Sequence, residues 1–185
     1  TGSYSLKNSK YEIYYGDIML MFDRTFAEKY KNVKQYMLIS PTAVNILGSN
    51  LPMAAPAQNQ QEYIDNYAQK LDSNIKFVDT YTTLLEHKKE DIFYRSDHHW
   101  TSLGAFYSYQ KLADVMDLSK KDSDDYDIEL VSNSFVGALS SESGYKTKKD
   151  KVKVYIPKDE NDKVVVNYEE EQKKTATLYE SEKLE

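Results

Sequence analysis

Residues 91–101, DIFYRSDHHWT, bring together two aspartates, two of the three histidines and the only tryptophan of the chain. In an extended segment the side chains of Asp97 and His99 would share one face, while His98 would point to the other. A carboxylate that accepts a hydrogen bond from imidazole Nδ1 fixes the tautomer and leaves Nε2 as a general base. If this stretch is extended, it therefore predicts that Asp97 and His99 approach within about 3 Å and form an acid–base pair.

Three interpretations of this stretch remain open from its residues alone. The first is a hydrogen-bonded structural corner, and the second is the acid and base of a hydrolase or transferase whose serine lies elsewhere. The third is a metal site like the Asp-His-His triplet of manganese phosphoesterases, which needs further ligands. Asp17, Asp79 and His87 exist, but none stands in an Asp-x-Asp or His-x-Asp pattern beside a strand. We therefore expect no metal and no cofactor.

Composition limits the classes of protein to consider. The 185 residues carry 24 Lys and Arg against 30 Asp and Glu, a net charge of −6 that is spread along the chain. This dispersed acidic balance argues against nucleic-acid binding. There are no cysteines, which excludes disulfides and thiolate metal sites. No apolar run approaches 18 residues and no signal peptide opens the chain, and both ends are typical of a piece cut from a longer protein.

Apolar spacing predicts how the chemistry-bearing stretch is positioned. Expected strands at 35–39, 75–79 and 92–94 alternate with expected helices at 58–72, 80–87 and 101–117, with a further short helix at 17–30. This alternation predicts a parallel α/β layer. Thr101 is expected to cap the last helix. Its apolar face, which contains Phe106, is expected to pack on strands 35–39 and 75–78.

The character of the chain changes after a polar stretch at 119–125. Expected strands at 126–131, 151–156, 163–168 and 175–179 follow with no intervening helix, and the segment 157–174 is highly charged. The sequence thus predicts one truncated domain in three parts. These are an N-terminal segment (1–34), an α/β part with the Asp-His-His-Trp motif (35–118) and a β-rich part with a charged tail (119–185).

The run from Arg95 to Thr101, followed by Gly104-Ala105, resembles the signature of the bacterial DHHW protein family. That family is similar to the alginate O-acetyltransferases, whose fold is a layered SGNH-hydrolase-like (flavodoxin-like) α/β sheet. Met37 to Thr42 and Phe135-x-Gly137-x-Leu139 resemble further parts of the family pattern. The resemblance implies that Asp97 is the triad acid and His99 the base, while His98 occupies a variable position. Arg95 and Trp100 are expected to contact the substrate.

The family's nucleophilic serine stands in a Gly-Asp-Ser-like box downstream of the motif, and no such box is present. Ser134 is the nearest imitation, because an apolar strand end precedes it, but it lacks the preceding glycine. Ser140, Ser141 and Ser143 have no activating neighbour, and Pro41 follows Ser40. We therefore expect that this chain ends before the nucleophile.

The resemblance implies an extracytoplasmic, cell-surface or membrane-anchored protein that transfers acetyl groups to, or removes them from, an exported polysaccharide. A membrane-bound O-acyltransferase is the implied partner on the donor side. The alternative is a non-catalytic carbohydrate-binding or scaffold domain of the cell surface, which the 17 tyrosines and the missing serine favour. The Asp97–His99 geometry distinguishes the two, because a scaffold needs no carboxylate on Nδ1.

Overall fold

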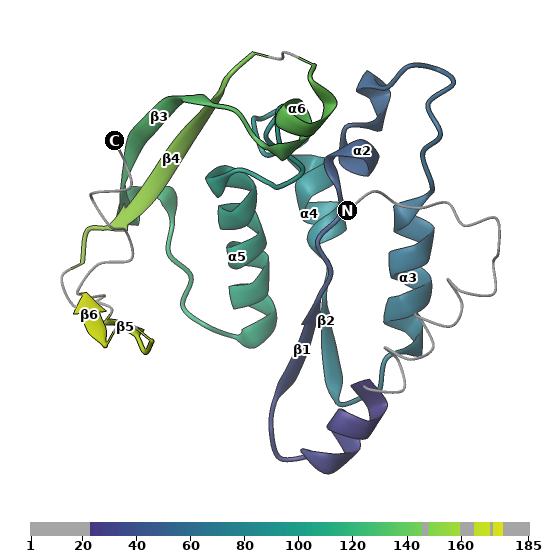
Figure 1. The fold of residues 1–185 in the computed structure, drawn as a ribbon. Helices are drawn as coiled ribbons and strands as arrows, with labels where there is room; N and C mark the ends of the chain where they lie inside the picture. Colours follow the sequence, from purple (N-terminus) through teal and green to yellow (C-terminus); the bar gives the residue numbers. More distant parts are fainter. Residues whose placement is uncertain (1–22, 146–147, 160–164, 171, 176–185) are drawn as a thin grey trace. The chain divides into compact units, whose positions relative to one another are not determined.

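The computed structural model describes residues 23–145, 148–159, 165–170 and 172–175 (Figure 1). The chain divides between Leu85 and Glu86 into two units. The three-part division expected from the sequence, with boundaries after residues 34 and 118, stays a prediction. Each unit has its own small sheet, and the acid–base motif belongs to the second.

The first unit contains a parallel strand pair and the crossover that such a pair requires. Strand β1 (Gln35–Leu38) pairs with β2 (Ile75–Val78) in parallel, and Gln35 lies opposite Ile75. The connection contains α2 (Ala43–Ile46), the 3-10 turn η1 (Gly48–Asn50) and α3 (Gln60–Lys70), and α4 (Thr80–Glu86) follows β2. The predicted β–α–β–α order of this part is confirmed.

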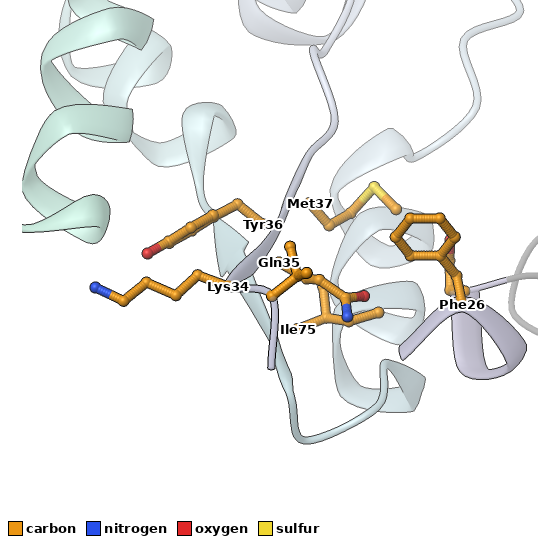
Figure 2. A pocket seen from close by; sticks show the side chains of 8 residues that line it. Phe26, Lys34, Gln35, Tyr36, Met37 and Ile75 are labelled. Atoms are coloured by element: carbon orange, nitrogen blue, oxygen red, sulfur yellow. The ribbon is translucent and has the colours of Figure 1, made fainter. Parts of the chain in front are cut away.

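Buried side chains from helices and strands form the core of the first unit; the apolar ones are Ala27, Ile46, Ile64, Tyr67, Val78, Tyr81 and Leu84. The Tyr67 hydroxyl donates a 2.5 Å hydrogen bond to Asp23, which ties the helical residues 23–29 to α3. A cavity of about 280 Å³ lies along β1, where Met37 points towards Phe26 and Tyr36 points to the other side of the strand (Figure 2). Among the residues that the structure describes, no histidine or serine lines it, so it does not resemble an acid–base site.

The second unit is built on a long antiparallel hairpin. Strands β3 (Tyr126–Phe135) and β4 (Asp150–Pro157) pair with Phe135 opposite Asp150, and their register shifts twice, between Leu130 and Ser132 and between Ser132 and Phe135. Helix α5 (Ser102–Met116) and the 3-10 turn η2 (Ser123–Asp125) precede the hairpin, and α6 (Ala138–Ser143) lies within its connection. A short pair, β5 (Val166–Tyr168) and β6 (Lys173–Thr175), follows.

Helix α5 begins where the sequence predicts. The Thr101 side chain accepts a hydrogen bond from the Gly104 amide, and it donates one of 2.7 Å to the Asp91 carbonyl. Gly104 is buried, and a Cβ at this position would run into the Ile92 carbonyl and lie 3.0 Å from the Trp100 Cβ. The glycine of the Gly104-Ala105 pair therefore lets the first turn of α5 lie directly against the motif segment.

Three local predictions were wrong. The expected strand at 92–94 is reduced to a single antiparallel bridge between Phe93 and Trp100, because the chain turns back on itself there. The β-rich part contains a helix, α6, that apolar spacing missed because its sequence, ALSSES, is short and polar. The connection between the first two expected strands, where only the helix at 58–72 was predicted, also includes the short helical turns α2 and η1. The helix expected from residue 17 and the strand expected to 179 extend outside the described residues.

The apolar face of α5 has partners that the sequence did not indicate. The Phe106 ring stacks on Tyr155 of β4, with 5.3 Å between ring centroids, and meets Tyr126 of β3 edge-on at 5.8 Å. Phe106 is half-buried rather than fully buried. This aromatic cluster joins α5 to the hairpin of the same unit.

We expect Phe106→Ala to destabilise the second unit by about 2 kcal/mol, below the 3–5 kcal/mol typical of a fully buried phenylalanine. Urea unfolding of the two chains measures the difference. Tyr145→Ala is the control, since this ring is 74% exposed and its loss should change stability by less than about 0.5 kcal/mol. Equal effects of the two substitutions would show that the aromatic cluster does not hold α5 to the hairpin.

Candidate active site

The motif lies at the tip of a narrow loop rather than in an extended strand. The Thr101 amide donates to the Ile92 carbonyl at 2.9 Å, and the Tyr94 amide donates to the His99 carbonyl at 3.2 Å. These bonds close a hairpin-like loop whose tip is Arg95–His98. Residues on this tip no longer alternate between two faces, so contacts decide where each side chain lies.

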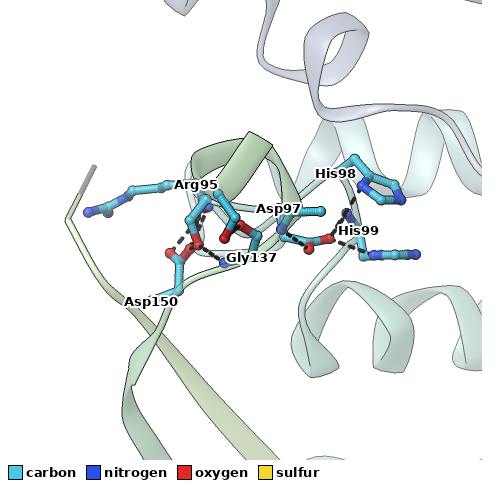
Figure 3. Close-up of polar contacts among 9 residues, drawn as sticks. Arg95, Asp97, His98, His99, Gly137 and Asp150 are labelled. Carbon is cyan, nitrogen blue, oxygen red and sulfur yellow. Dashed lines mark hydrogen bonds and ion pairs between the residues drawn. The ribbon is translucent and has the colours of Figure 1, made fainter. Parts of the chain in front are cut away.

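Asp97 is the centre of these contacts (Figure 3). Its Oδ1 accepts hydrogen bonds from the His99 amide at 2.9 Å and from the His99 ring nitrogen Nδ1 at 2.5 Å. The first bond forms an Asx turn, in which a side-chain oxygen accepts the amide two residues further along the chain. Its Oδ2 accepts the Ala138 amide, at the start of α6, at 3.0 Å. The predicted proximity of Asp97 and His99 is confirmed, although a tight turn produces it and not an extended segment.

The charge of Asp97 is stabilised even though the residue is buried. Burial alone would raise the pKa of its carboxyl group, but the amides of Ala138 and His99 and the His99 ring outweigh it and lower the pKa to about 2. The carboxylate is thus ionised at neutral pH and can only accept hydrogen bonds. The His99 Nδ1 atom must therefore carry the proton of their bond, which leaves Nε2 with a lone pair.

The two histidines lie on the same side of the loop, contrary to the expectation that His98 points away. His98 Nδ1 is 3.7 Å from the same Asp97 oxygen, and the two ring centroids are 4.0 Å apart. The side chains of His98 and His99 are 51% and 67% exposed. Of the two histidines, only His99 is within hydrogen-bonding distance of the carboxylate. The geometry therefore distinguishes His99 from His98, as the predicted pattern does.

A second buried carboxylate, which the sequence did not indicate, holds the other side of the loop. Asp150, the first residue of β4, accepts the Ser96 amide at 2.8 Å, the Ser96 hydroxyl at 2.6 Å and the Arg95 amide at 3.1 Å. The Ser96 hydroxyl in turn accepts the Gly137 amide at 2.9 Å. This contact could not be predicted from local sequence patterns, because Ser96 and Asp150 are 54 residues apart in the chain.

Gly137 explains one part of the Phe135-x-Gly137-x-Leu139 pattern. It is buried, and a Cβ there would overlap the Asp97 side chain, with Asp97 Oδ2 and Cγ among the atoms it would meet. The Phe135 ring packs on Tyr94, with 5.1 Å between centroids. The end of β3 and the start of α6 are therefore shaped to fit the motif loop.

The remaining predicted residues lie at different distances from this centre. The Arg95 side chain points away from His99 (Figure 3) and pairs with Asp91 at 3.3 Å. Trp100 is half-buried and forms the bridge with Phe93. Ser134 is exposed on β3, and within the described residues no serine hydroxyl is hydrogen-bonded to the His99 ring. Their roles stay predictions.

The other serines have backbone partners. The hydroxyls of Ser140, Ser141 and Ser143 donate to the carbonyls of Tyr145, Gly137 and Leu139, and that of Ser40 donates to Pro41. Each of these bonds is local and structural. The expectation that these serines are not nucleophiles stays a prediction.

The alternative metal interpretation can be compared with the geometry. Asp97, His98 and His99 each present one ligand atom within 4.8 Å of the others. However, the facing atoms of Asp97 and His99, Oδ1 and Nδ1, form a direct 2.5 Å hydrogen bond with each other. Asp79 accepts the Thr82 amide at the start of α4, and His87 is bonded to Glu90 at 2.7 Å, so each has a local partner. Asp17 lies outside the described residues.

A cavity of about 690 Å³ adjoins the loop on the side of Arg95 and Asp150. Aromatic side chains line it, namely Phe93, Tyr94, Phe106, Tyr107 and Tyr155. Lys149, just before β4, and Lys151 and Lys153 on β4 add positive charge to its wall. A pocket of this composition suits a ligand with both apolar faces and polar groups.

The parallel pair with its helical crossover defines an α/β protein. Its loop before α5 carries a carboxylate–imidazole pair of the kind that hydrolase triads contain. The chain belongs to the family of SGNH hydrolase-like domains of the acetyltransferase AlgX, whose family model matches residues 18–184. Its fold is therefore the SGNH-hydrolase-like fold expected from the motif. A comparison with curated protein sequences finds no significant match.

Solved structures agree with this assignment. A DHHW family protein from Eubacterium siraeum is similar at a TM-score of 0.69 and 28% identity, over 77% of this chain and 48% of that one. Bacillus cereus PatB1 with a sulfonyl adduct gives 0.68 and 22%, over 88% and 57%. The O-acetyltransferase domain of Pseudomonas putida AlgJ gives 0.57 and 19%, over 78% and 56%. The chain thus spans about half the length of these structures.

The low pKa of Asp97 makes a prediction about stability and pH. Because the folded-state pKa is depressed to about 2, below the ordinary value near 3.8, the stabilisation is complete above about pH 5 and is lost as the pH falls towards 2. We expect the stability gap between the parent and Asp97→Asn to narrow by about 2 kcal/mol over that range. Urea unfolding at pH 6 and pH 2 measures it. Asp91→Asn, with a side chain 88% exposed, should show no comparable change.

Gly137→Ala should destabilise the chain by about 1–3 kcal/mol, because the new methyl group must displace the Asp97 carboxylate or the start of α6. Gly48→Ala is a matched control, since a Cβ there meets nothing within 4 Å. Thermal unfolding compares the two. If both substitutions shift the midpoint equally, Gly137 is not needed for the fit around Asp97.

Proposed function

We propose that this chain supplies the acid, Asp97, and the base, His99, of an O-acetyltransferase or acetylesterase of the Ser-His-Asp type. The proposed substrate is a cell-surface or exported polysaccharide. The observation that carries the proposal is the 2.5 Å bond from a buried, ionised carboxylate to Nδ1 of an imidazole that is 67% exposed. A purely structural histidine would more often have its ring packed and both nitrogens satisfied.

The proposed reaction divides between the two residues and a serine. His99 Nε2 takes the proton of the serine hydroxyl as its oxygen attacks the acetyl carbonyl, and Asp97 stabilises the imidazolium that forms. The imidazolium then returns the proton to the leaving group of the donor, which leaves an acetyl-serine. In the second half, His99 removes a proton from a sugar hydroxyl or water as that oxygen attacks the acetyl-serine. The ester bond to the serine then breaks, and the imidazolium returns the proton to the serine oxygen.

The described residues do not identify the nucleophilic serine of the proposed reaction. Ser134 remains a candidate, but it has no hydrogen bond to His99 in the described part of the chain. This chain covers only 48% and 57% of two neighbouring structures, and the family resemblance puts the serine downstream of the motif. We propose that the nucleophile belongs to a segment outside this chain.

Neither Asp97 nor His99 lines the cavity beside Arg95, so we propose that it binds a part of the saccharide away from the reacting hydroxyl. Tyrosine and phenylalanine rings can cover the apolar faces of sugars, while Arg95 and the lysines of β4 can bind hydroxyl or acidic groups. Trp100, at the base of the motif loop, is the second proposed substrate contact. The proposed donor-side partner, a membrane-bound O-acyltransferase, and an extracytoplasmic location rest on the family resemblance. No helix in the described residues has the length and apolar character needed to cross a bilayer.

The alternative of a non-catalytic carbohydrate-binding scaffold is less favoured. The cavity would serve a scaffold equally well, so it does not distinguish the two functions. The Asp97–His99 bond does, since a scaffold needs no buried carboxylate on Nδ1 of an exposed imidazole. The geometry therefore supports the catalytic proposal.

The two adjacent histidines give a sharp test of the proposed roles. In the protein expressed from the complete reading frame that encodes this chain, His99→Ala should lower kcat for acetyl-ester hydrolysis about 10²–10⁴-fold. His98→Ala is a matched control at the next position, and it should retain activity within a few-fold. Equal losses in the two variants, or full activity in His99→Ala, would contradict the assignment of His99 as the base.

The chain of 185 residues alone is expected to show no turnover of an activated acetyl ester, because a base without a nucleophile cannot form the acetyl-enzyme. A chromogenic acetate ester provides the assay. Turnover that disappears in Ser134→Ala would overturn this expectation and make Ser134 the nucleophile. Turnover that persists in that variant would point to another serine.

A further inference from the structure

Asp150 stands at the point where the hairpin ends and meets the motif loop. It lies opposite Phe135 in the β3–β4 pairing and is only 9% exposed. Its carboxylate accepts three donors, the Arg95 and Ser96 amides and the Ser96 hydroxyl. A buried carboxylate is stable only with such donors, so the shape of the loop and the charge of Asp150 depend on each other.

Ser96 connects Asp150 to the start of α6. It is completely buried, and its hydroxyl has one proton, which it donates to Asp150 at 2.6 Å. The lone pairs of the same oxygen face the Gly137 amide at 2.9 Å, and the Ser96 carbonyl accepts the Ser140 amide at 3.1 Å. Asp150 therefore fixes the orientation of the hydroxyl that positions the start of α6.

The start of α6 in turn holds the acid of the proposed pair. Gly137 is followed by Ala138, whose amide donates to Asp97 at 3.0 Å, and the other Asp97 oxygen bonds His99. Hydrogen bonds and one peptide unit thus connect Asp150 to His99 without a gap. Asp150 itself contacts neither Asp97 nor His99 among the described hydrogen bonds.

We propose that Asp150 is a positioning residue for the Asp97–His99 pair, acting through the buried Ser96 hydroxyl and the Gly137–Ala138 backbone that binds the Asp97 carboxylate. The catalytic meaning of this role rests on the proposed function. The structural role, in which Asp150 helps to position Asp97, does not rest on it, because the hydrogen bonds that reach Asp97 exist whether or not the chain is an enzyme.

The amides that donate to Asp97, those of Ala138 and His99, report on this role. In Asp150→Asn, which keeps the side-chain shape but removes the charge, we expect their hydrogen exchange, followed by NMR, to become about tenfold faster. Exchange in α5 should change far less. Asp127→Asn, an exposed aspartate of the same hairpin, is the control and should leave all these amides unchanged.

Ser96→Ala provides a second variant if Asp150→Asn fails to fold. It removes the bridging hydroxyl while leaving the Asp150 bonds to the loop amides, and it should also accelerate exchange at Ala138 and His99. Unchanged exchange at Ala138 and His99 in the folded variant would overturn the proposal. So would a common acceleration of every protected amide in the second unit, because Asp150 would then act only on overall stability.

An enzymatic measurement tests the consequence separately. In the protein from the complete reading frame, Asp150→Asn should lower kcat for hydrolysis of a small acetyl ester about tenfold or more and leave KM within about twofold, as expected of a misplaced base. A small ester is used because Asp150 also lines the proposed saccharide cavity, which such a substrate does not need. A raised KM with unchanged kcat would contradict the proposal. If that protein has no acetyl-transfer activity at all, the proposed function fails, while the exchange measurement still decides the positioning role.

Discussion

The carboxylate of Asp97 is the charge around which the second unit of this protein is arranged. A negative charge that is 8% exposed needs donors on several sides, and it obtains them from the His99 amide, the His99 ring and the Ala138 amide. These donors come from a loop and from a helix 41 residues further along the chain. The requirement to satisfy one charge thus fixes the loop tip, the start of α6 and the imidazole together.

The electrostatics of this arrangement keep the proton of the Asp97–His99 hydrogen bond on the imidazole rather than on the carboxylate. The amide bonds lower the pKa of Asp97 to about 2, so the carboxylate does not compete with His99 for a proton at neutral pH. Its Oδ1 instead accepts a hydrogen bond from the His99 ring at 2.5 Å. An ionised partner on Nδ1 and an exposed ring are the conditions under which Nε2 can accept and return a proton to a bound group.

Local pattern was sufficient to predict much of this structure. The β1–α3–β2–α4 order, the Thr101 cap and the pairing of Asp97 with His99 were all predictable from spacing and residue type. What pattern could not predict depends on contacts between distant residues. Asp150 is one acidic residue among 30 until the hairpin brings it to Ser96, and the polar helix α6 is stabilised by its contacts with the loop. The tight turn at Asp97 was also missed, because its hydrogen bond to the His99 amide overrides strand-like alternation.

The tautomer of His99 is the property that tests this account most directly. Two-bond ¹H–¹⁵N NMR correlations of the imidazole rings, recorded above pH 8 on the parent chain, distinguish the three histidines and the protonated nitrogen of each. The account predicts that neutral His99 carries its proton on Nδ1, held by Asp97, whereas His98 shows the tautomer mixture of an exposed ring. A His99 ring protonated mainly on Nε2, or one that cannot be distinguished from His98, would contradict it.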